Sequence, residues 1–215
     1  MATFIYRWVL VVMHRYSIAL RAANPTFDEG LVYGRYLDIA AEGFFRFMLG
    51  PQAAEVIAAA YTQPNNDYSF QNVTFAVHDE AIVGMAAGYT AEQHSRFSEQ
   101  PLKQAAGYRA LRTGTIELLC APLLRILDTL ADGDFYLQAI AIDTELRGEG
   151  VGSALMDSME DRARAGGSTR LSLDVSAKNE GARRLYGRRG MTVESQWPKR
   201  LVIPGLRLFR MTRTL

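Results

Sequence analysis

The sequence predicts a single globular domain of the α/β class, in which strands and helices are interspersed along the chain. Its 215 residues suffice for one domain with a sizeable core and are too few for two comfortable ones. Apolar residues make up 48% and charged residues 22%, which is the balance of an ordinary folded protein. From residue 17 onward, β-like runs are interspersed with apolar stripes of helical spacing, so both kinds of element must share this core.

The composition also argues against several classes of function. No apolar run approaches the roughly 20 residues that span a bilayer. The formal net charge is +1, so no overall field draws the chain to nucleic acid or to a membrane. A single cysteine, Cys120, rules out an intramolecular disulfide and fits a reducing compartment, and the histidines at 14, 78 and 94 are too widely spaced for a zinc pattern. We therefore expect a cytoplasmic protein that holds no metal and contacts neither membrane nor nucleic acid.

Residues 1–16 form an N-terminal extension, and residues 17–215 form the domain. The segment 4–13 is apolar but interrupted by Arg7, and the uninterrupted run 8–13 is shorter than a signal-peptide core of roughly 7–15 residues. We expect an extra strand or a loose extension. A second interpretation places the start of translation at Met13.

The first part of the domain predicts a strand followed by helices. Asn24 and Pro25 stop the strand, and Thr26 with Glu29 forms a capping box that opens the first helix. The expected elements are a strand at 17–22, a helix from 26 to 40, an aromatic turn at 44–47, a helix at 52–61 and a turn at 63–67.

The middle of the chain predicts a hairpin followed by an insertion. The β-like runs 73–77 and 81–89 are separated by three polar residues. The insertion, 90–134, is longer than a usual hairpin loop. Apolar residues recur at helical spacing between Ile116 and Leu130, and Pro122 within that stripe predicts a kink or a new helix start.

The last part alternates strands with two helices. The expected elements are strands at 135–142, 171–175, 191–196 and 206–212, and helices at 152–163 and 179–188. The most informative stretch is the turn 147–152, Arg-Gly-Glu-Gly-Val-Gly, between a strand and a helix. Alternate glycines expose backbone N–H groups, the helix start adds unpaired donors, and Arg147 adds a cation, so the turn suits a pyrophosphate.

Several ligands fit such a turn. A P-loop would end in Gly-Lys-Ser/Thr, which is missing here. A dinucleotide fingerprint needs a third glycine where Ser153 stands. Coenzyme A and a turn without any ligand remain as interpretations of the turn alone.

A second element narrows this choice. Residues 179–191 read Asn-Glu-Gly-Ala-Arg-Arg-Leu-Tyr-Gly-Arg-Arg-Gly-Met, and together with the turn they closely resemble the GNAT superfamily of acyl-CoA N-acyltransferases. The resemblance is specific over 135–191, diffuse over 17–88, and absent over 1–14 and 90–134. The family's signature Arg/Gln-x-x-Gly-x-Gly/Ala is occupied by Arg147, Gly150 and Gly152; the later signature Asn-x-x-Ala-x-x-Leu-Tyr-x-x-x-Gly-Phe is matched by Asn179, Ala182, Leu185, Tyr186 and Gly190, with Met191 in place of the aromatic residue.

This resemblance implies a mixed, mostly antiparallel sheet with helices on both faces. Its strands 135–142 and 171–175 would run parallel and splay apart, so that the pantetheine arm pairs with them like an added strand. Acetyl-CoA would be the co-substrate, without a metal. The coenzyme contacts implied are Ile140, Ala141, Ile142, Arg147, Gly148, Gly150, Val151, Gly152, Ser153, Asn179, Ala182 and Arg188.

The resemblance also implies roles in catalysis. The oxyanion donor is a backbone N–H near Ile142, and Tyr186 matches the usual general acid, although packing in the core is an alternative role for it. A phenol with a pKa of about 10 can protonate a thiolate of pKa about 8.5. Gln138 stands on a strand that often carries an acidic residue in relatives and cannot serve as a base. No general base is visible; the candidate carboxylates are Glu42, Asp67, Glu117 and Asp174, and a water relay or capture of neutral amine remains open.

The C-terminal region 183–215 carries nine lysines and arginines against Glu194 alone. A solvated basic face and attraction of the coenzyme's 3′-phosphate both explain this, with Arg188 or Arg189 as the contact. The apolar residues around Phe45 suit an acceptor wall or ordinary core. The insertion is expected to cover the acceptor pocket or to form a homodimer face.

We therefore expect an N-acetyltransferase that acts on a small-molecule or peptide amine. The alternatives are a non-catalytic acyl-CoA-binding module of the same fold and, less well supported, a nicotinamide or flavin protein.

Overall fold

The computed structural model describes residues 9–13, 16–107, 130–198 and 207–215 of the chain. Its eight strands form one sheet in the order β1-β2-β3-β4-β5-β6-β8-β7. All neighbouring strands are antiparallel except β5 and β6, which run parallel. The predicted mixed, mostly antiparallel sheet is confirmed. A doubly wound parallel sheet, which a dinucleotide-binding protein would need, is not what these strands form.

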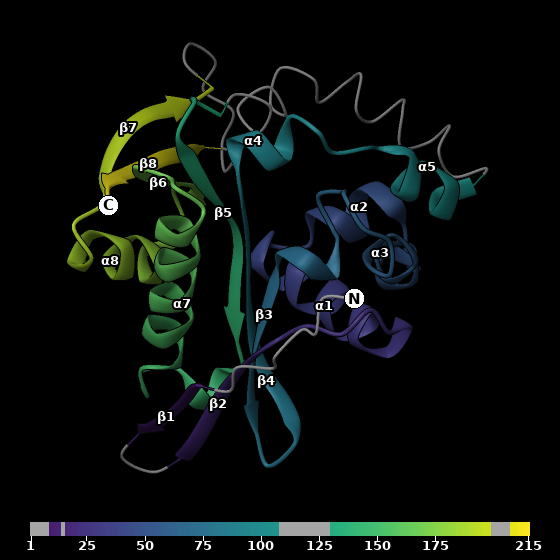
Figure 1. The fold of residues 1–215 in the computed structure, drawn as a ribbon, viewed down its shortest axis with the longest axis horizontal. Helices are drawn as coiled ribbons and strands as arrows, with labels where there is room; N and C mark the ends of the chain where they lie inside the picture. Colours follow the sequence, from purple (N-terminus) through teal and green to yellow (C-terminus); the bar gives the residue numbers. More distant parts are fainter. Residues whose placement is uncertain (1–8, 14–15, 108–129, 199–206) are drawn as a thin grey trace.

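The N-terminal half supplies four strands and most of one helical layer (Figure 1). Strand β1 pairs with β2 at the outside of the sheet, so the extra-strand interpretation of the extension holds for its described part. The elements are β1 (Val9–Met13), β2 (Tyr16–Ala22), α1 (Phe27–Ala40), α2 (Phe44–Leu49), α3 (Ala53–Tyr61), a 3₁₀ turn η1 (Phe70–Asn72), β3 (Val73–His78), β4 (Ala81–Thr90), α4 (Ala91–His94) and α5 (Gln100–Ala106).

Only half of the capping box predicted at the start of α1 is present. The Thr26 hydroxyl accepts a hydrogen bond from the Glu29 N–H at 3.3 Å. The Glu29 carboxylate instead accepts two hydrogen bonds from Asn24, both at 2.7 Å, and pairs with Arg21 at 2.9 Å. Glu29 therefore ties the helix start to the end of β2.

The aromatic turn predicted at 44–47 is wrong, because these residues form helix α2. Gly43 adopts a positive φ of 86°, which reverses the chain after α1. The Asp38 carboxylate then accepts a hydrogen bond from the Arg46 N–H at 2.9 Å, within the first turn of α2. A carboxylate from the preceding helix thus satisfies an N–H group that a helix start leaves unpaired.

Two short helices begin the insertion. Thr90 and Gln93 form a complete capping box at α4, with hydrogen bonds of 3.0 and 2.9 Å. Helix α5 follows, and its Ala106 is buried against the helical layer. The predicted apolar stripe from Ile116 to Leu130 lies almost entirely outside the described residues, so its role stays a prediction.

The C-terminal half supplies the remaining strands and the second helical layer. The last strand begins two residues later than predicted. The elements are β5 (Asp134–Ile142), a 3₁₀ turn η3 (Thr144–Leu146), α7 (Val151–Ala165), β6 (Arg170–Ser176), α8 (Glu180–Arg188), β7 (Thr192–Trp197) and β8 (Leu208–Thr214).

Helices cover both faces of the sheet, as predicted (Figure 1). Helices α1, α2, α3 and α5 lie on one face and pack on a core that includes Tyr33, Ile57 and Phe75. Helices α7 and α8 lie on the other face, over a core that includes Leu155 and Leu173. Among the helices that the structure describes, none is long and apolar enough to cross a membrane.

Candidate active site

The two parallel strands separate halfway along their length. Strands β5 and β6 pair from Asp134↔Arg170 to Leu137↔Leu173, and no pairing continues past Leu137 among the residues of these two strands. Beyond this point β5 pairs only with β4, up to Gly84↔Ile142. Residues 138–142 of β5 therefore present unpaired backbone N–H and C=O groups toward β6. The splay that the family resemblance implied is present.

A β-bulge at Gln138 marks the start of this opening. The β4–β5 register shifts between Ala87↔Ala139 and Gly88↔Leu137, which leaves Gln138 as the extra residue. Simple alternation would put Leu137 and Ala139 on the same face, but Leu137 belongs to the α7 side and Ala139 to the α1 side. After the bulge, the side chains of β5 therefore point to the faces opposite to those that simple alternation predicts. The Gln138 side chain accepts a hydrogen bond from the Tyr33 hydroxyl at 3.0 Å.

The glycine turn lies between β5 and α7 and needs two glycines for its shape. Gly148 and Gly150 have φ of 88° and 89°, a region that other residues rarely adopt. Its hydrogen bonds leave the N–H groups of Gly148 and of residues 150–153 without an acceptor in the described part of the chain. These donors, at the start of a 15-residue helix, suit an anion.

The turn, the end of β5 and α8 lie next to one another. A Cβ atom placed on Gly152 would lie 3.8 Å from a Leu185 methyl and 4.0 Å from an Ile142 methyl. The start of the turn is held from the other helical layer, because the Tyr36 hydroxyl donates to the Asp143 carboxylate at 2.6 Å. The structure therefore brings together three segments that were predicted to share one site.

The Arg147 side chain is exposed beside these donors, and no ion pair engages it within the described ranges. Free N–H groups and an unpaired guanidinium are the donor set that a diphosphate requires. These residues therefore fit coenzyme A. No group of three or more histidine, cysteine, aspartate or glutamate side chains suited to a metal occurs in the part of the chain that the structure describes.

Helix α8 begins at Asn179, whose side chain accepts a hydrogen bond from the Ala182 N–H at 3.0 Å. This oxygen of Asn179 therefore caps the helix. Ala182 packs against the core on the α7 side, and a pocket of about 280 Å³ near the helix start is lined by Glu180, Arg183 and Arg184.

Tyr186 is the one buried residue of α8, with 6% of its surface exposed, and it packs in the core on the α7 side. Its hydroxyl has no hydrogen-bond partner among the described residues. Burial raises the pKa of the Tyr186 phenol well above its ordinary value. The phenol is therefore neutral at physiological pH and keeps its proton.

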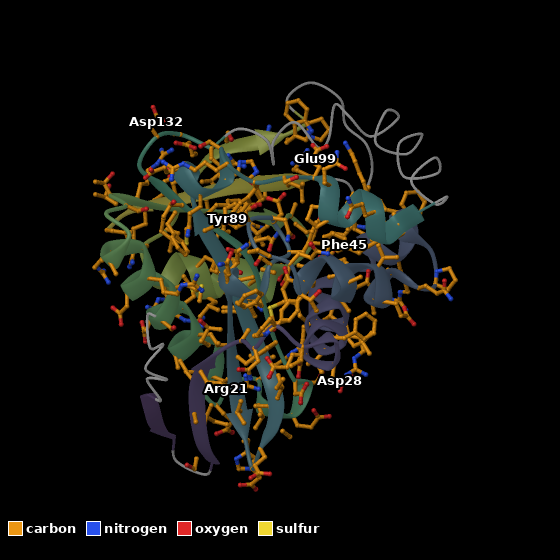
Figure 2. The ribbon with its side chains drawn as sticks, turned by 45° about the vertical axis from the view of Figure 1, so that its right-hand side comes forward. Arg21, Asp28, Phe45, Tyr89, Glu99 and Asp132 are labelled. Atoms are coloured by element: carbon orange, nitrogen blue, oxygen red, sulfur yellow. The ribbon has the colours of Figure 1, made fainter. Side chains whose placement is uncertain are left out.

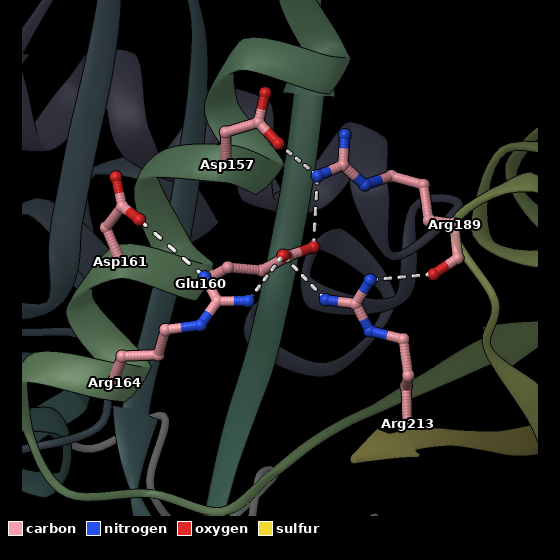
Figure 3. Close-up of polar contacts among 6 residues, drawn as sticks. All are labelled: Asp157, Glu160, Asp161, Arg164, Arg189 and Arg213. Carbon is pink, nitrogen blue, oxygen red and sulfur yellow. Dashed lines mark hydrogen bonds and ion pairs between the residues drawn. The ribbon is translucent and has the colours of Figure 1, made fainter. Parts of the chain in front are cut away.

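Part of the predicted basic face pairs with acids from earlier in the chain (Figure 3). Arg189 pairs with Asp157 and, at 3.0 Å, with Glu160, and Arg213 reaches Glu160 at 2.6 Å. Burial alone would raise the pKa of Glu160, but hydrogen bonds from Arg213 and Arg189 outweigh it and lower that pKa. Arg189 is therefore engaged within the fold, whereas Arg188 is exposed without an ion pair to any described residue.

The surroundings of the candidate general bases differ in the structure. The Asp174 side chain is 4% exposed, and it accepts two hydrogen bonds from Arg210, at 2.6 and 3.0 Å, and one from Tyr136 at 3.1 Å. Both carboxylate oxygens are thus occupied by donors within the fold and are not free for an incoming amine. Glu42 follows α1 with a positive φ of 54°, and Glu117 lies outside the described residues.

Asp67 is the remaining candidate, and it belongs to a group of residues that sequence reasoning missed. Its carboxylate lies 3.4 Å from His94 and hydrogen-bonds with Tyr89. Burial raises the pKa of Asp67, and the charge of His94 opposes that effect. The sequence places aromatic rings at 89, 94 and 97, but nothing in it indicates that they meet Asp67.

The apolar residues proposed as an acceptor wall are mostly core. Met48 is buried, and Phe44 and Phe45 pack against the core on the α1 side. Phe45 also contacts Tyr68 edge to face, with ring centroids 5.9 Å apart. Phe47 is 60% exposed.

The comparisons with known proteins agree with this architecture. A family model described as the Acetyltransferase (GNAT) family matches residues 41–191, which is more than half of the chain. A search of curated proteins found no match.

Solved structures of similar fold cover nearly the whole chain. One is an acetyltransferase with 22% identity and a TM-score of 0.63, covering 91% of this chain and 98% of that one. Another is Ard1 from Thermoplasma volcanium, with 14% identity and a TM-score of 0.56, covering 92% and 97%. A third is an acetyltransferase of the GNAT family from Streptococcus pneumoniae, with 16% identity and a TM-score of 0.54, covering 92% and 99%. At these identities the similarity shows the fold.

Proposed function

The chain belongs to the GNAT family of acetyltransferases, and we propose that it transfers the acetyl group of acetyl-CoA to a primary amine by direct attack in a ternary complex. The observation that carries this proposal is the opening between β5 and β6 beside the free N–H groups of the glycine turn. One feature offers backbone partners to an extended chain and the other offers donors to a diphosphate.

The coenzyme-binding role is divided between the turn and the strand. Arg147 and the N–H groups of Gly148 and residues 150–153 would hold the pyrophosphate. Backbone groups of residues 140–142 would hold the pantetheine arm along the unpaired side of β5. Arg188 is the proposed contact of the 3′-phosphate because it is exposed and free of ion pairs in the described regions.

Catalysis requires a neutral amine, stabilisation of charge on the carbonyl oxygen, and a proton for the sulfur. Bound acetyl-CoA supplies an activated acyl group as a thioester. The backbone N–H near Ile142 donates to the carbonyl oxygen as negative charge develops there. Tyr186 donates its phenolic proton to the sulfur as the carbon–sulfur bond breaks and is then reprotonated from solvent. The attacking nitrogen loses one proton to water.

The raised pKa of Tyr186 works against this step, because it makes the phenol a weaker acid than the thiol that forms. Proton donation therefore costs free energy and must accompany the breaking of the carbon–sulfur bond. The absence of a described hydrogen-bond partner leaves the Tyr186 proton available for such a transfer. If Tyr186 serves only as core, the chain is instead an acyl-CoA-binding module without turnover.

One pair of assays tests the proposal. Thermal shift with acetyl-CoA, NAD and ATP identifies the coenzyme, and release of free thiol across a panel of primary amines measures transfer. We expect stabilisation by acetyl-CoA alone and thiol release with at least one amine. Stabilisation by acetyl-CoA without release for any amine would favour the binding module, and no response to acetyl-CoA would refute both.

A further inference from the structure

An acidic and aromatic cluster lies on the face of the sheet opposite the glycine turn. It consists of Asp67, Tyr89, His94 and Tyr136, and we call it the acidic aromatic cluster. The Asp67 carboxylate lies 3.4 Å from the His94 ring, and the side chains of these two residues are 28% and 27% exposed. Tyr89 and Tyr136 are both 4% exposed. The cluster therefore combines a partly accessible carboxylate with buried aromatic rings.

The rings of the cluster contact one another closely. His94 stacks on Tyr89 with ring centroids 5.4 Å apart and an interplanar angle of 6°. Tyr89 also meets Tyr136 at 5.8 Å and Phe97 at 5.1 Å. Figure 2 shows Tyr89 near the middle of the molecule, with Phe45 and Glu99 of the helical layer to its right. A carboxylate next to such rings suits an organic cation, which aromatic faces and a negative charge both attract.

The cluster lies at the opening between β5 and β6. Tyr136 immediately precedes Leu137, where pairing with β6 ends. Its hydroxyl donates to Asp174 across the two strands at 3.1 Å. Tyr33, whose pKa is raised by burial and by nearby charges that include Asp67, donates to Gln138 at the bulge. An acceptor entering from this face would thus reach the opening beside the cluster.

The Asp67 carboxylate should bind a nitrogen of the acceptor that is protonated rather than the one that attacks the thioester. A nearby negative charge stabilises an ammonium group, and an amine held that way stays protonated and cannot attack a carbonyl carbon. The attacking nitrogen must therefore lie elsewhere on the acceptor.

We propose that the acidic aromatic cluster binds a second ammonium group of the acceptor, so that the acceptor class is the aliphatic diamines and related organic dications. This inference rests on the proposed acetyl transfer and names its substrate. The ammonium group contacts the Asp67 carboxylate and the accessible part of the His94 ring, because the rings of Tyr89 and Tyr136 are buried behind it. The neutral amine at the other end of the acceptor meets the thioester in the opening.

Three amines of equal chain length test the proposal: 1,4-diaminobutane, butylamine and 4-aminobutanoate. With acetyl-CoA, kcat/KM should be highest for the diamine and lowest for the aminobutanoate. In Asp67→Asn the ratio of kcat/KM for the diamine to kcat/KM for butylamine should fall about tenfold, which corresponds to the loss of about 1.4 kcal/mol from one charged contact. The matched control is Asp79→Asn, since Asp79 also lies 3.4 Å from a histidine, His78, but on the exposed β3–β4 turn. It should leave the preference unchanged.

Calorimetry of 1,4-diaminobutane and butylamine against the wild-type protein gives a readout that needs neither catalysis nor a variant. Tighter binding of the diamine, without thiol release, would support the cluster while refuting acetyl transfer. Equal affinity for the two amines, no binding of the diamine, or an unchanged preference in folded Asp67→Asn would each overturn the diamine proposal, whatever the transfer assay shows.

Discussion

Replacing Tyr186 by phenylalanine tests the proposed acid most directly, because it keeps the ring and removes only the hydroxyl. If Tyr186 protonates the leaving sulfur, kcat should fall by about 10²–10⁴-fold. Binding of acetyl-CoA should persist, since the free N–H groups of the turn are untouched. A core residue without a catalytic role predicts a turnover number near that of the wild-type protein.

The structure also fixes the expected change in stability. The Tyr186 hydroxyl makes no hydrogen bond to another described residue, so its removal strands no other group, and it is not one of the buried polar atoms that lack a partner in the described part of the chain. We therefore expect the free energy of unfolding to change by less than about 0.5 kcal/mol, which corresponds to a shift of at most about 2 °C in melting temperature. Activity should fall while stability stays the same.

Tyr61→Phe is the matched control. Tyr61 is also buried, but its hydroxyl donates to Glu29 at 3.4 Å in the other helical layer. Its loss should lower the melting temperature slightly and leave kcat unchanged. Single-turnover kinetics with an amine that the enzyme accepts measure the chemical step, and calorimetry with acetyl-CoA measures coenzyme binding. A Tyr186→Phe rate within a few-fold of wild type, where chemistry limits turnover, would refute the acid role.

Four further substitutions, with Arg96→Glu as a control, test the turn and the arginine network. Arg147→Glu should weaken acetyl-CoA binding in calorimetry, whereas Arg96→Glu on the exposed face of the insertion should not; equal affinities would remove Arg147 from the pyrophosphate site. Gly148→Ala should lower the free energy of unfolding by about 1–3 kcal/mol, because Gly148 has a φ of 88°. Gly152→Ala should fold normally, since the added Cβ meets only ordinary contacts, but it should bind acetyl-CoA more weakly. Thermal melts measure the first effect and titrations with acetyl-CoA the second. Glu160→Gln should destabilise by about 2 kcal/mol at pH 7. The pKa of Glu160 is lower in the folded than in the unfolded protein, so its contribution to stability is present above the unfolded pKa of about 4.5 and is lost as the pH falls through the folded pKa. The difference in melting temperature between the wild-type protein and Glu160→Gln should therefore shrink below about pH 4. A difference that does not depend on pH would contradict the network.

The sequence was informative where local chemistry dictates local structure. Gly148 and Gly150 adopt the positive φ that their turn requires, and Asn179 caps α8 through its own side chain. Both features depend on residues within a few positions of each other. The order of strands and helices followed from periodicity for the same reason, and the GNAT signatures indicated the splayed pair.

Features that depend on partners far apart in the sequence could not be predicted. Glu160 and Arg189 meet because α7 packs beside α8, and nothing in the charge pattern pairs them. The helix at Phe44–Leu49 depends on a carboxylate from α1, and the β5 bulge depends on the register against β4. Asp67, Tyr89, His94 and Tyr136 likewise come from four separate segments of the chain and meet only in the folded structure.

The opening between β5 and β6 has a consequence for the protein before its coenzyme arrives. Unpaired strand backbone is a template on which another chain can form a ladder, and natural proteins usually shield it at the outer edges of a sheet. Here the exposed backbone lies at residues 138–142, in the interior of the strand order. Coenzyme at 100 times its dissociation constant would stabilise the fold by about 2.7 kcal/mol. The coenzyme-free protein should therefore be the form that aggregates, and the supply of acetyl-CoA should set how long the protein survives as well as how fast it works.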